Sequence, residues 1–466
     1  MKNDDLFATH QDYDAMIGRW RFWMAAYEGT GELVAAGALT RHPREDDQTY
    51  SDRCAEAVGF NYSRSIVHLF GNYLFEKPPM RELGSLAEDS LWKAFEADCD
   101  LFGSDLATFF VEQQKYASVY GHVGVLVDSP GRVAPMTRKE ERERGVYPYL
   151  AAYHPETILD WEYERDESGR PRLVRVKLLE EDGAVLIYER DRWERWLPAG
   201  NTGGVLAAEA QLVASGENPL GRVPFVWLMN VKGRRRNIGV SDIADIALLD
   251  ASILRDLSLG AEVIKNSAFP MFRTPKQPPD ASGEREVEVG PRAVLEWDPE
   301  FEGGAKQDWL EAAAREPIEA ILMWTSKKAE EIYRMANAGG LHATQVSAEA
   351  KSGVALRQEF QLLNTVLAAK ANNLEEAERA IIGLWLDWQG RGGEASQVRV
   401  ERPRSFSVED LAADLDNAIR GAELIAESPT FQTEMKMRMA KRLLPKAGES
   451  LERIREELHA QHAGSV

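Results

Sequence analysis

The stretch that decides the fold is SDIADIALLDASILRDLSLGAEVIKN, residues 241–266. Its apolar residues recur at helical spacing, which predicts one long amphipathic helix. Ser241 suits the N-cap position, and Asp242 and Asp245 stand where the helix dipole favours acids. Pro270 follows and closes the segment.

A second long helix is predicted over residues 317–335, PIEAILMWTSKKAEEIYRM. Pro317 is tolerated at the first helical position. Between the two helices, residues 269–306 are rich in Pro and acids and carry no helical pattern. Two helices separated by a compact insert predict a hairpin-like stalk with the insert at its far end.

A break and a very long helix come next. Residues 336–345, ANAGGLHATQ, are small and uncharged, and residues 347–389 show a sustained helical pattern. That helix would span on the order of 60 Å, so we expect a kink near Gly353 or at Asn372 and Asn373. This order of parts is typical of a ring subunit with a loop beside a central channel.

The rest of the chain predicts an α+β fold that is mainly helical. Helices are expected at residues 10–27, 50–75, twice within 90–120, and in the tail from Ser407, Thr430 and near Glu449. A buried strand is expected at 123–127. A β-rich part then spans 147–228, with strands expected at 149–153, 158–164, 173–179, 184–189, 192–197 and 223–230.

Composition sets the class of protein. The chain has 466 residues, 44% of them hydrophobic and 28% charged, which is enough for about three domains with real cores. No stretch approaches the length of a membrane span, and the N-terminal residues do not resemble a signal peptide. With only two cysteines we expect no disulfide, and we interpret Cys54 and Cys99 as small core residues.

The formal net charge is −20. This is the wrong sign for a DNA-binding protein, because affinity for DNA comes mostly from Lys and Arg that neutralise phosphates. An acidic wall does suit a channel that must let DNA pass, since it repels phosphate. By itself the charge is explained by solubility.

Common catalytic motifs are missing from the sequence, including a Walker-type phosphate loop, a Cys-x-x-Cys pair, a His-Glu-x-x-His zinc motif and a Gly-x-Ser-x-Gly elbow. Two acidic groups, residues 180–182 and the pair Asp98 and Asp100, have the composition of a metal site. We interpret both as solvated faces, and His154 as a packed or surface residue.

The insert concentrates acids. Between Asp280 and Glu302 it has eight acidic residues and two arginines, Arg285 and Arg292. Residues 286–290 alternate like a strand, and the expected partner of that strand is 293–297. The insert is either an exposed hairpin without a partner or a docking surface anchored by Trp297 and Trp309. The acids are Asp280, Glu284, Glu286, Glu288, Glu296, Asp298, Glu300 and Glu302.

Several short runs resemble one family. They are YEGTGELVAAGALT (27–40), GNYLFEKPP (71–79), YGHVGVLVD (120–128), YHPETILDW (153–161) and SGVALR (352–357). In this order they resemble the portal-like proteins of tailed bacteriophages. Each run alone is weak because none is catalytic, but their order is fairly specific from residue 27 to residue 388.

The resemblance implies a map of the chain. Residues 1–239 would form the wing, which holds the β-rich segment, and residues 347–390 the long wing helix. Residues 240–266 and 311–335 would form the helical stem, and 267–310 a small α/β clip. Residues 336–346 would form the tunnel loop, and 391–466 a helical crown.

The resemblance also implies roles. The tunnel loop would face double-stranded DNA without reading its sequence, through Asn337, Ala338, Gly339, Gly340, Leu341, His342 and Thr344. The clip would bind the large terminase subunit or a head-tail adaptor, through Asp280, Glu284, Glu286, Glu288 and Trp297.

The implied protein is a ring, usually a dodecamer, at one capsid vertex of a virion, assembled in the host cytoplasm. It would contact the major capsid protein or a scaffold and no membrane, need no cofactor and catalyse nothing. Two other functions stay open: a metal-dependent phage nuclease or hydrolase using paired carboxylates, and a head-tail adaptor or scaffold protein.

Overall fold

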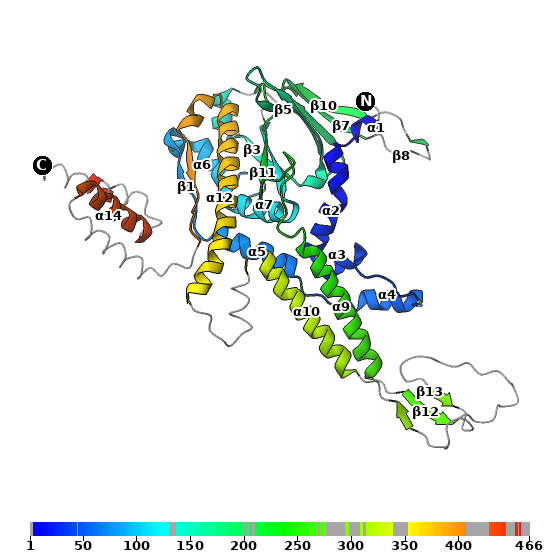
Figure 1. The fold of residues 1–466 in the computed structure, drawn as a ribbon. Helices are drawn as coiled ribbons and strands as arrows, with labels where there is room; N and C mark the ends of the chain where they lie inside the picture. Colours follow the sequence, from blue (N-terminus) through cyan, green and yellow to red (C-terminus); the bar gives the residue numbers. More distant parts are fainter. Residues whose placement is uncertain are drawn as a thin grey trace. The chain divides into compact units, whose positions relative to one another are not determined.

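The computed structural model describes residues 3–43, 45–130, 137–198, 201–202, 205–206, 210–268, 271–275, 294–297, 308–310, 314–338, 353–406, 428–443, 453–454 and 456–457. The chain divides into two compact units, Met1–Ser405 and Phe406–Val466. The second unit contains helix α14, Pro429–Leu443. More of the described residues lie in helices than in strands, so the expected mixed and mainly helical α+β class is confirmed (Figure 1).

The N-terminal helices are α1 (Asn3–Leu6), α2 (Gln11–Glu28), α3 (Thr30–Ala35), α4 (Asp47–Ala55) and α5 (Tyr62–Leu74). The single helix expected over residues 50–75 is wrong, because the chain breaks between α4 and α5. Asn61 caps α5 by accepting a hydrogen bond from the Arg64 N–H at 2.8 Å. Gly59 precedes it, where an added Cβ would lie 2.9 Å from Thr30 Oγ1.

The next part of the chain follows the prediction closely. Two helices, α6 (Ser90–Ala97) and α7 (Leu106–Tyr120), lead through left-handed Gly121 into β2 (His122–Asp128), whose residues are all buried. Strand β2 is the centre of an antiparallel sheet of order β11-β2-β3, with β3 at Tyr149–Tyr153 and β11 at Phe225–Met229. The short helix α8 (Arg138–Arg144) precedes β3.

A second antiparallel sheet has the order β10-β7-β6-β5-β4. The expected strands are confirmed within two residues at each end. Strand β10 was missed because it is a mostly exposed edge strand with Ala, Ser and Gly in its second half. The strands are β4 (Ile158–Arg165), β5 (Pro171–Leu179), β6 (Val185–Glu189), β7 (Arg192–Leu197) and β10 (Gln211–Glu217).

The long helix α12, Gly353–Trp388, packs across the sheet that holds β2 and β11. Its buried stripe includes Leu363, Leu367, Leu374, Ile381 and Trp385. Residues 347–352 of the expected helix lie outside the described residues. Two further strand pairs are β1 (Met80–Glu82) with β15 (Arg399–Glu401), and β8 (Asn201–Thr202) with β9 (Val205–Leu206).

Two long helices then leave this α/β body side by side. They are α9 (Ile246–Ser267) and α10 (Arg315–Met335), with strands β12 (Met271–Pro275), β13 (Val294–Trp297) and β14 (Asp308–Leu310) between them in sequence (Figure 1). Ser241 is not the N-cap, which corrects the expected start of the first helix. Residues 242–245 form turns, and Ser241 Oγ accepts from the Ile243 N–H at 3.1 Å.

Candidate functional site: the α9–α10 stalk

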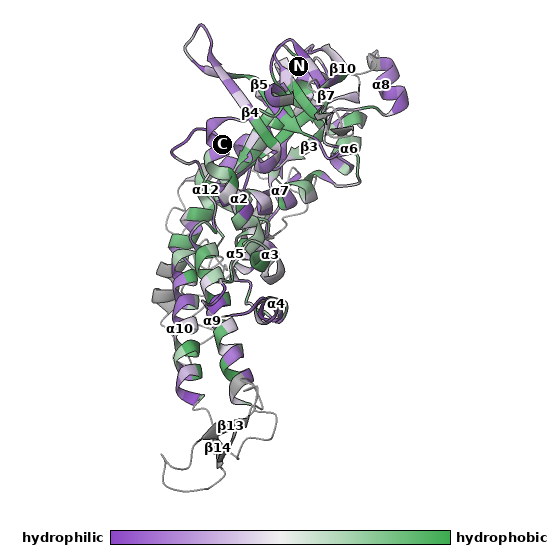
Figure 2. Ribbon diagram, turned by 90° about the vertical axis from the view of Figure 1, so that its right-hand side faces the viewer, coloured by the Kyte–Doolittle hydropathy of each residue, from purple (hydrophilic) through white to green (hydrophobic). Residues whose placement is uncertain are grey.

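We call the antiparallel pair α9 and α10 the stalk. The helices approach closely where Gly260 of α9 faces α10, since a Cβ there would lie 3.7 Å from Ile321 Cγ2. Both views show the two helices running side by side away from the body (Figures 1 and 2). The expected hairpin-like stalk is therefore present in the described part of the chain.

Buried polar contacts hold the base of the stalk to the body. The carboxylate of Asp250, 3% exposed, accepts from the backbone N–H groups of Tyr62 and Ser63 at 3.4 and 2.8 Å. It thereby satisfies two free donors at the start of α5. Burial raises the pKa of Asp250, against these hydrogen bonds. From α10, the Tyr333 ring meets Tyr62 edge-on, with centroids 6.2 Å apart.

Further from the body, one lysine links the two helices of the stalk. Lys328 Nζ of α10 donates to Ser252 Oγ at 2.7 Å and to Asp256 Oδ2 at 2.5 Å, both on α9. The same ammonium group lies 5.2 Å from the centre of the Trp324 ring. This cation–π contact fixes where Trp324 sits on the stalk.

The side of α10 away from α9 is apolar and exposed. Thr325, Ala329 and Ile332 are buried and mark the packed face. Met323 lies on the opposite side and is 74% exposed, and Trp324, on one flank, is 57% exposed. We call Met323, Trp324 and Lys327 the outer ridge, since Lys327 stands one turn further along the same side. Figure 2 shows hydrophobic residues along both stalk helices.

An apolar groove of about 560 Å³ lies on the other side, between the stalk and the α4 region. Its walls leave large side chains in contact with water, including Val58 (68% exposed), Phe60 (51%) and Ile264 (54%). Leu322, Ile318 and Ile321 of α10 complete it. We call this surface the groove.

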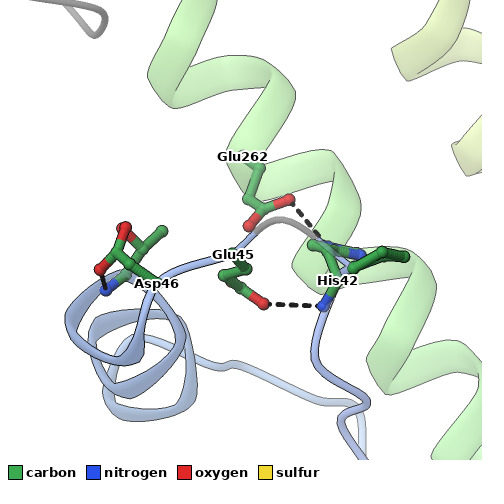
Figure 3. A pocket seen from close by; sticks show the side chains of 6 residues that line it. His42, Glu45, Asp46 and Glu262 are labelled. Carbon is green, nitrogen blue, oxygen red and sulfur yellow. Dashed lines mark hydrogen bonds and ion pairs between the residues drawn. The ribbon is translucent and has the colours of Figure 1, made fainter.

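A polar pocket of about 520 Å³ adjoins the start of α4 (Figure 3). Within the described ranges, one group of three potential metal ligands was found, and it lies here: His42, Glu45 and Glu262. The guanidinium group of Arg53 already forms ion pairs with the carboxylates of Glu45 and Glu262. The guanidinium is 2.7 and 2.8 Å from Glu45 oxygens and 3.3 Å from Glu262 Oε1.

The charge state of this pocket follows from Arg53. Hydrogen bonds from the guanidinium, aided by the His42 backbone N–H, lower the pKa of Glu45 to about 2. The pocket therefore holds a carboxylate that is already neutralised by an internal cation. A divalent ion would have to compete with Arg53 for both carboxylates, so we interpret this group as a structural ion network.

The acidic groups that sequence analysis considered as metal ligands are also engaged. Glu180 and Asp182 both accept hydrogen bonds from the guanidinium of Arg195. Asp98 and Asp100 accept from backbone N–H groups of the loop before α7. Cys99 is buried and reduced, as expected of a core residue, while Cys54 is only half-buried.

Most of the predicted docking residues cannot be placed. Asp280, Glu284, Glu286 and Glu288, and the strand expected at 286–290, lie outside the described residues. The strand expected at 293–297 is present as β13, which contains Trp297. Strand β13 pairs in parallel with β12, and β14 pairs with the other edge of β12 in antiparallel fashion. Strands β12 and β14 were not predicted.

Of the predicted tunnel-loop residues, Asn337 and Ala338 are described, whereas Gly339, Gly340, Leu341, His342 and Thr344 lie outside the described residues. Asn337 adopts a left-handed conformation, with φ of 56°. Its N–H donates to Arg334 O, and the Ala338 N–H donates to Tyr333 O at 2.8 Å. This pattern is a Schellman motif that ends α10 and leaves Ala338 only 2% exposed in the single chain.

Neither the groove nor the outer ridge was predicted from the sequence. One signal was available for the ridge: Leu322, Met323 and Trp324 are consecutive. Consecutive helical positions are about 100° apart, so three large apolar residues in a row exceed the width of a single packed face. Nothing in the sequence indicated that Val58 and Phe60 would lie against α9.

No family model matches the chain, and no curated protein matches it. Among the described residues, no helix has the length and the apolar character that are needed to span a membrane.

Solved structures similar to this chain come from gene transfer agent (GTA) particles. One, from the virion of the native particle, has a TM-score of 0.46 at 13% identity, covering 87% of this chain and 98% of that one. Two are from necks: that of the empty particle (TM-score 0.45, 13% identity, 85% and 95% covered) and that of the native particle (0.41, 13%, 86% and 95%). Likeness at this level carries no argument about this chain.

Proposed function

We propose that this chain is the subunit of a closed homo-oligomeric ring and that the ring is a phage-type portal. One observation carries the proposal: a paired-helix stalk leaves large apolar side chains uncovered on two sides. A lone chain gains nothing from exposing Met323 and Trp324 on α10 and, beside the stalk, Val58 and Phe60 between α4 and α5. Closed symmetry covers such surfaces in every copy.

The order of parts supports the portal class. The stalk stands between an α/β body and the long helix α12, and it carries a small separate sheet between its helices. In the proposed assignment the stalk is the stem, the β12–β14 region is the clip, and the segment between α10 and α12 is the tunnel loop. The ring would be a dodecamer at a capsid vertex, held by capsid or scaffold protein.

Charge supports passage of DNA through the ring. With a net charge of −20 per chain, copies arranged around an axis repel phosphate as a whole. Binding to DNA would therefore be weak and independent of sequence, as a channel for packaging and ejection requires. The clip would dock the large terminase subunit during packaging and a head-tail adaptor afterwards.

The assembly claim is tested by native mass spectrometry and negative-stain imaging of the purified protein. We expect one closed ring with a central hole. A monomer at every concentration would overturn the proposal.

The role of the clip is tested by deleting residues 280–290. Rings should persist, while capture of the terminase in a pull-down should be lost. Unchanged capture of the terminase would show that the deleted residues of the clip are not part of the docking surface.

The role of the tunnel loop is tested by Thr344→Arg, because an added cation strengthens contact with phosphate and its salt dependence. Packaging should slow while rings assemble normally. Normal packaging in capsids shown to contain the variant ring would exclude a DNA contact at this residue. Ala338 is unsuited to this test because its side chain is buried.

The hydrolase alternative finds its best location at His42, Glu45 and Glu262. Arg53 pairs with both carboxylates that a catalytic metal would need as ligands, so this group does not favour the alternative. Neither the fold nor this pocket offers a specific observation for the adaptor or scaffold alternative.

A further inference from the structure

The tip of the outer ridge, Met323, and the groove lie on different sides of α10. On α10, Ile318, Ile321 and Leu322 line the groove. Met323 is about 100° round the helix from Leu322 and about 140° or more from Ile318 and Ile321, whereas Trp324 is about 60° from Ile321 and so lies on the flank between the two surfaces. Each chain thus offers a projecting apolar surface on one side of its stalk and a hollow apolar surface on the other.

We propose that the outer ridge of one copy docks into the groove of the next copy in the ring. This inference rests on the proposed ring and names the surfaces that close it. Met323 and Trp324 would enter the space bordered by Val58, Phe60 and Ile264. A large aromatic side chain at the centre of such a contact buries on the order of 200 Å².

Charge complements shape at the same contact. Lys327 stands on the outer ridge, one turn beyond Met323 and Trp324. It is 59% exposed and paired with Glu330 at 2.8 Å. The edge of the groove is formed by α4 and the turn after it, which expose Asp52 and Glu56. Glu56 is itself paired with Lys265 at 3.1 Å.

Exposed pairs of this kind contribute little in water and rearrange readily. Docking would therefore place the Lys327 ammonium beside an acidic edge at small cost. In a twofold contact the outer ridge and the groove of each copy would have to face the same partner at once. Met323 and the groove point away from different sides of α10, which favours a head-to-tail contact instead. Repeating a ridge-to-groove contact gives either a closed ring or a filament. A second copy is thus the occupant that fits both surfaces at once.

The direct test uses paired cysteines in the full-length chain with Cys54→Ser as the background. Met323→Cys and Phe60→Cys place one thiol on the outer ridge and one in the groove. Oxidation of the double variant should give a ladder of linked copies up to the full ring. Either single variant should remain unlinked, whereas linked dimers from Met323→Cys alone would overturn the head-to-tail contact.

A second test uses charge. Lys327→Glu should weaken assembly at least about tenfold in native mass spectrometry, and so should Asp52→Lys with Glu56→Lys. Combining all three should restore rings. If rings are not restored, Lys327 does not pair with Asp52 and Glu56 of the next copy.

Apolar burial is tested by Met323→Asp, which should leave a folded monomer by circular dichroism. The matched control is Leu362→Asp, since Leu362 of α12 is similarly exposed (61%) and should tolerate the change. If the unaltered chain forms no ring, the proposed function fails. If it forms rings that Met323→Asp and Lys327→Glu leave intact, only the ridge-to-groove contact is overturned.

Discussion

Gly121 and Gly239 touch through their backbones. A Cβ added to Gly239 would lie 1.8 Å from the carbonyl oxygen of Gly121, and a Cβ on Gly121 would lie 2.3 Å from that of Gly239. The Gly121 oxygen also accepts from the Asn230 N–H at 2.9 Å. Gly121 ends α7 and Gly239 precedes the turns that lead into α9. This backbone contact therefore fixes the point at which the stalk leaves the body.

We expect Gly239→Ala to destabilise the protein by about 3 kcal/mol, because an overlap this large with rigid backbone forces a shift on both segments. Urea unfolding followed by circular dichroism measures the change. Gly18→Ala is the matched control, since Gly18 lies inside α2 with nothing within 4 Å of an added Cβ. It should gain about 0.5–1 kcal/mol from helix propensity. Equal stability of the two variants would contradict the close contact.

Just beyond this contact, Lys370 of α12 is fully buried. Its ammonium group donates to Asp242 and, at 2.6 Å, to Asn230 Oδ1, and it lies 4.7 Å from the Phe70 ring centre. Burial lowers the pKa of Lys370, while Asp242 favours its charged form. One lysine thus joins the long helix, the end of β11 and the turns before the stalk.

Replacing this lysine should be costly. Lys370→Met leaves the buried carboxylate of Asp242 without its cation, and we expect a loss of about 3–5 kcal/mol. Lys232→Met is the matched control, because Lys232 makes a surface pair with Glu376 with both side chains more than half exposed. That change should stay within about 0.5 kcal/mol. Thermal unfolding of both variants at one pH compares them, and similar melting temperatures would argue against a buried ion pair.

The sequence predicted those elements whose hydrophobic period is regular. Strands β3 and β7 and the end of α10 at Met335 were placed to the residue, since alternation or a helical stripe marks them. Prediction from the sequence failed where a local contact or a long-range pairing, and not the hydrophobic period, determines the structure. The break before α5 depends on Gly59 and the Asn61 cap, and the parallel pairing of β12 with β13 joins segments about 20 residues apart.

The site was only partly predictable for a related reason. The stalk follows from two helical patterns with an insert between them, so its existence could be read directly. The groove depends on α4 lying against α9, a tertiary contact made by Lys265 with Glu56 and by Arg53 with Glu262. Neither pair stands out in a chain with 76 acidic residues. Lys370 and Asp242 are likewise 128 residues apart.

Stability should fall as the pH drops below neutrality, partly through His122. Burial lowers its pKa from 6.5 to about 3, and the Gly239 N–H points at its Nδ1 at 3.4 Å. The unfolded chain therefore binds a proton that the folded chain excludes. This contribution is full above about pH 6.5 and is lost as the pH falls towards about 3, costing about 2 kcal/mol by about pH 5.

His122→Gln tests this contribution through the slope of unfolding free energy against pH, which does not depend on the absolute stability of the variant. The slope between about pH 5 and about pH 6.5 should become shallower by roughly one proton. His154 remains as a second contributor, because burial lowers its pKa to about 4. An unchanged slope would show that His122 is protonated in the folded protein.

Arg53 determines whether the pocket of His42, Glu45 and Glu262 can bind a metal ion. Since Arg53 is paired with both carboxylates, neither a chelator nor millimolar Mn²⁺ should change the melting temperature of the unaltered protein. Arg53→Met removes that cation from a pair in which both side chains are under 10% exposed, and it should cost about 3 kcal/mol. It also frees two carboxylates and an imidazole that lie within 4.8 Å of one another. Mn²⁺ should therefore stabilise the Arg53→Met variant, because a ligand that binds only the folded state raises its stability. The double variant Arg53→Met with Glu45→Gln should lose that response. Stabilisation of the unaltered protein by Mn²⁺ would instead show that the ion displaces Arg53. The pocket would then be a metal-binding site.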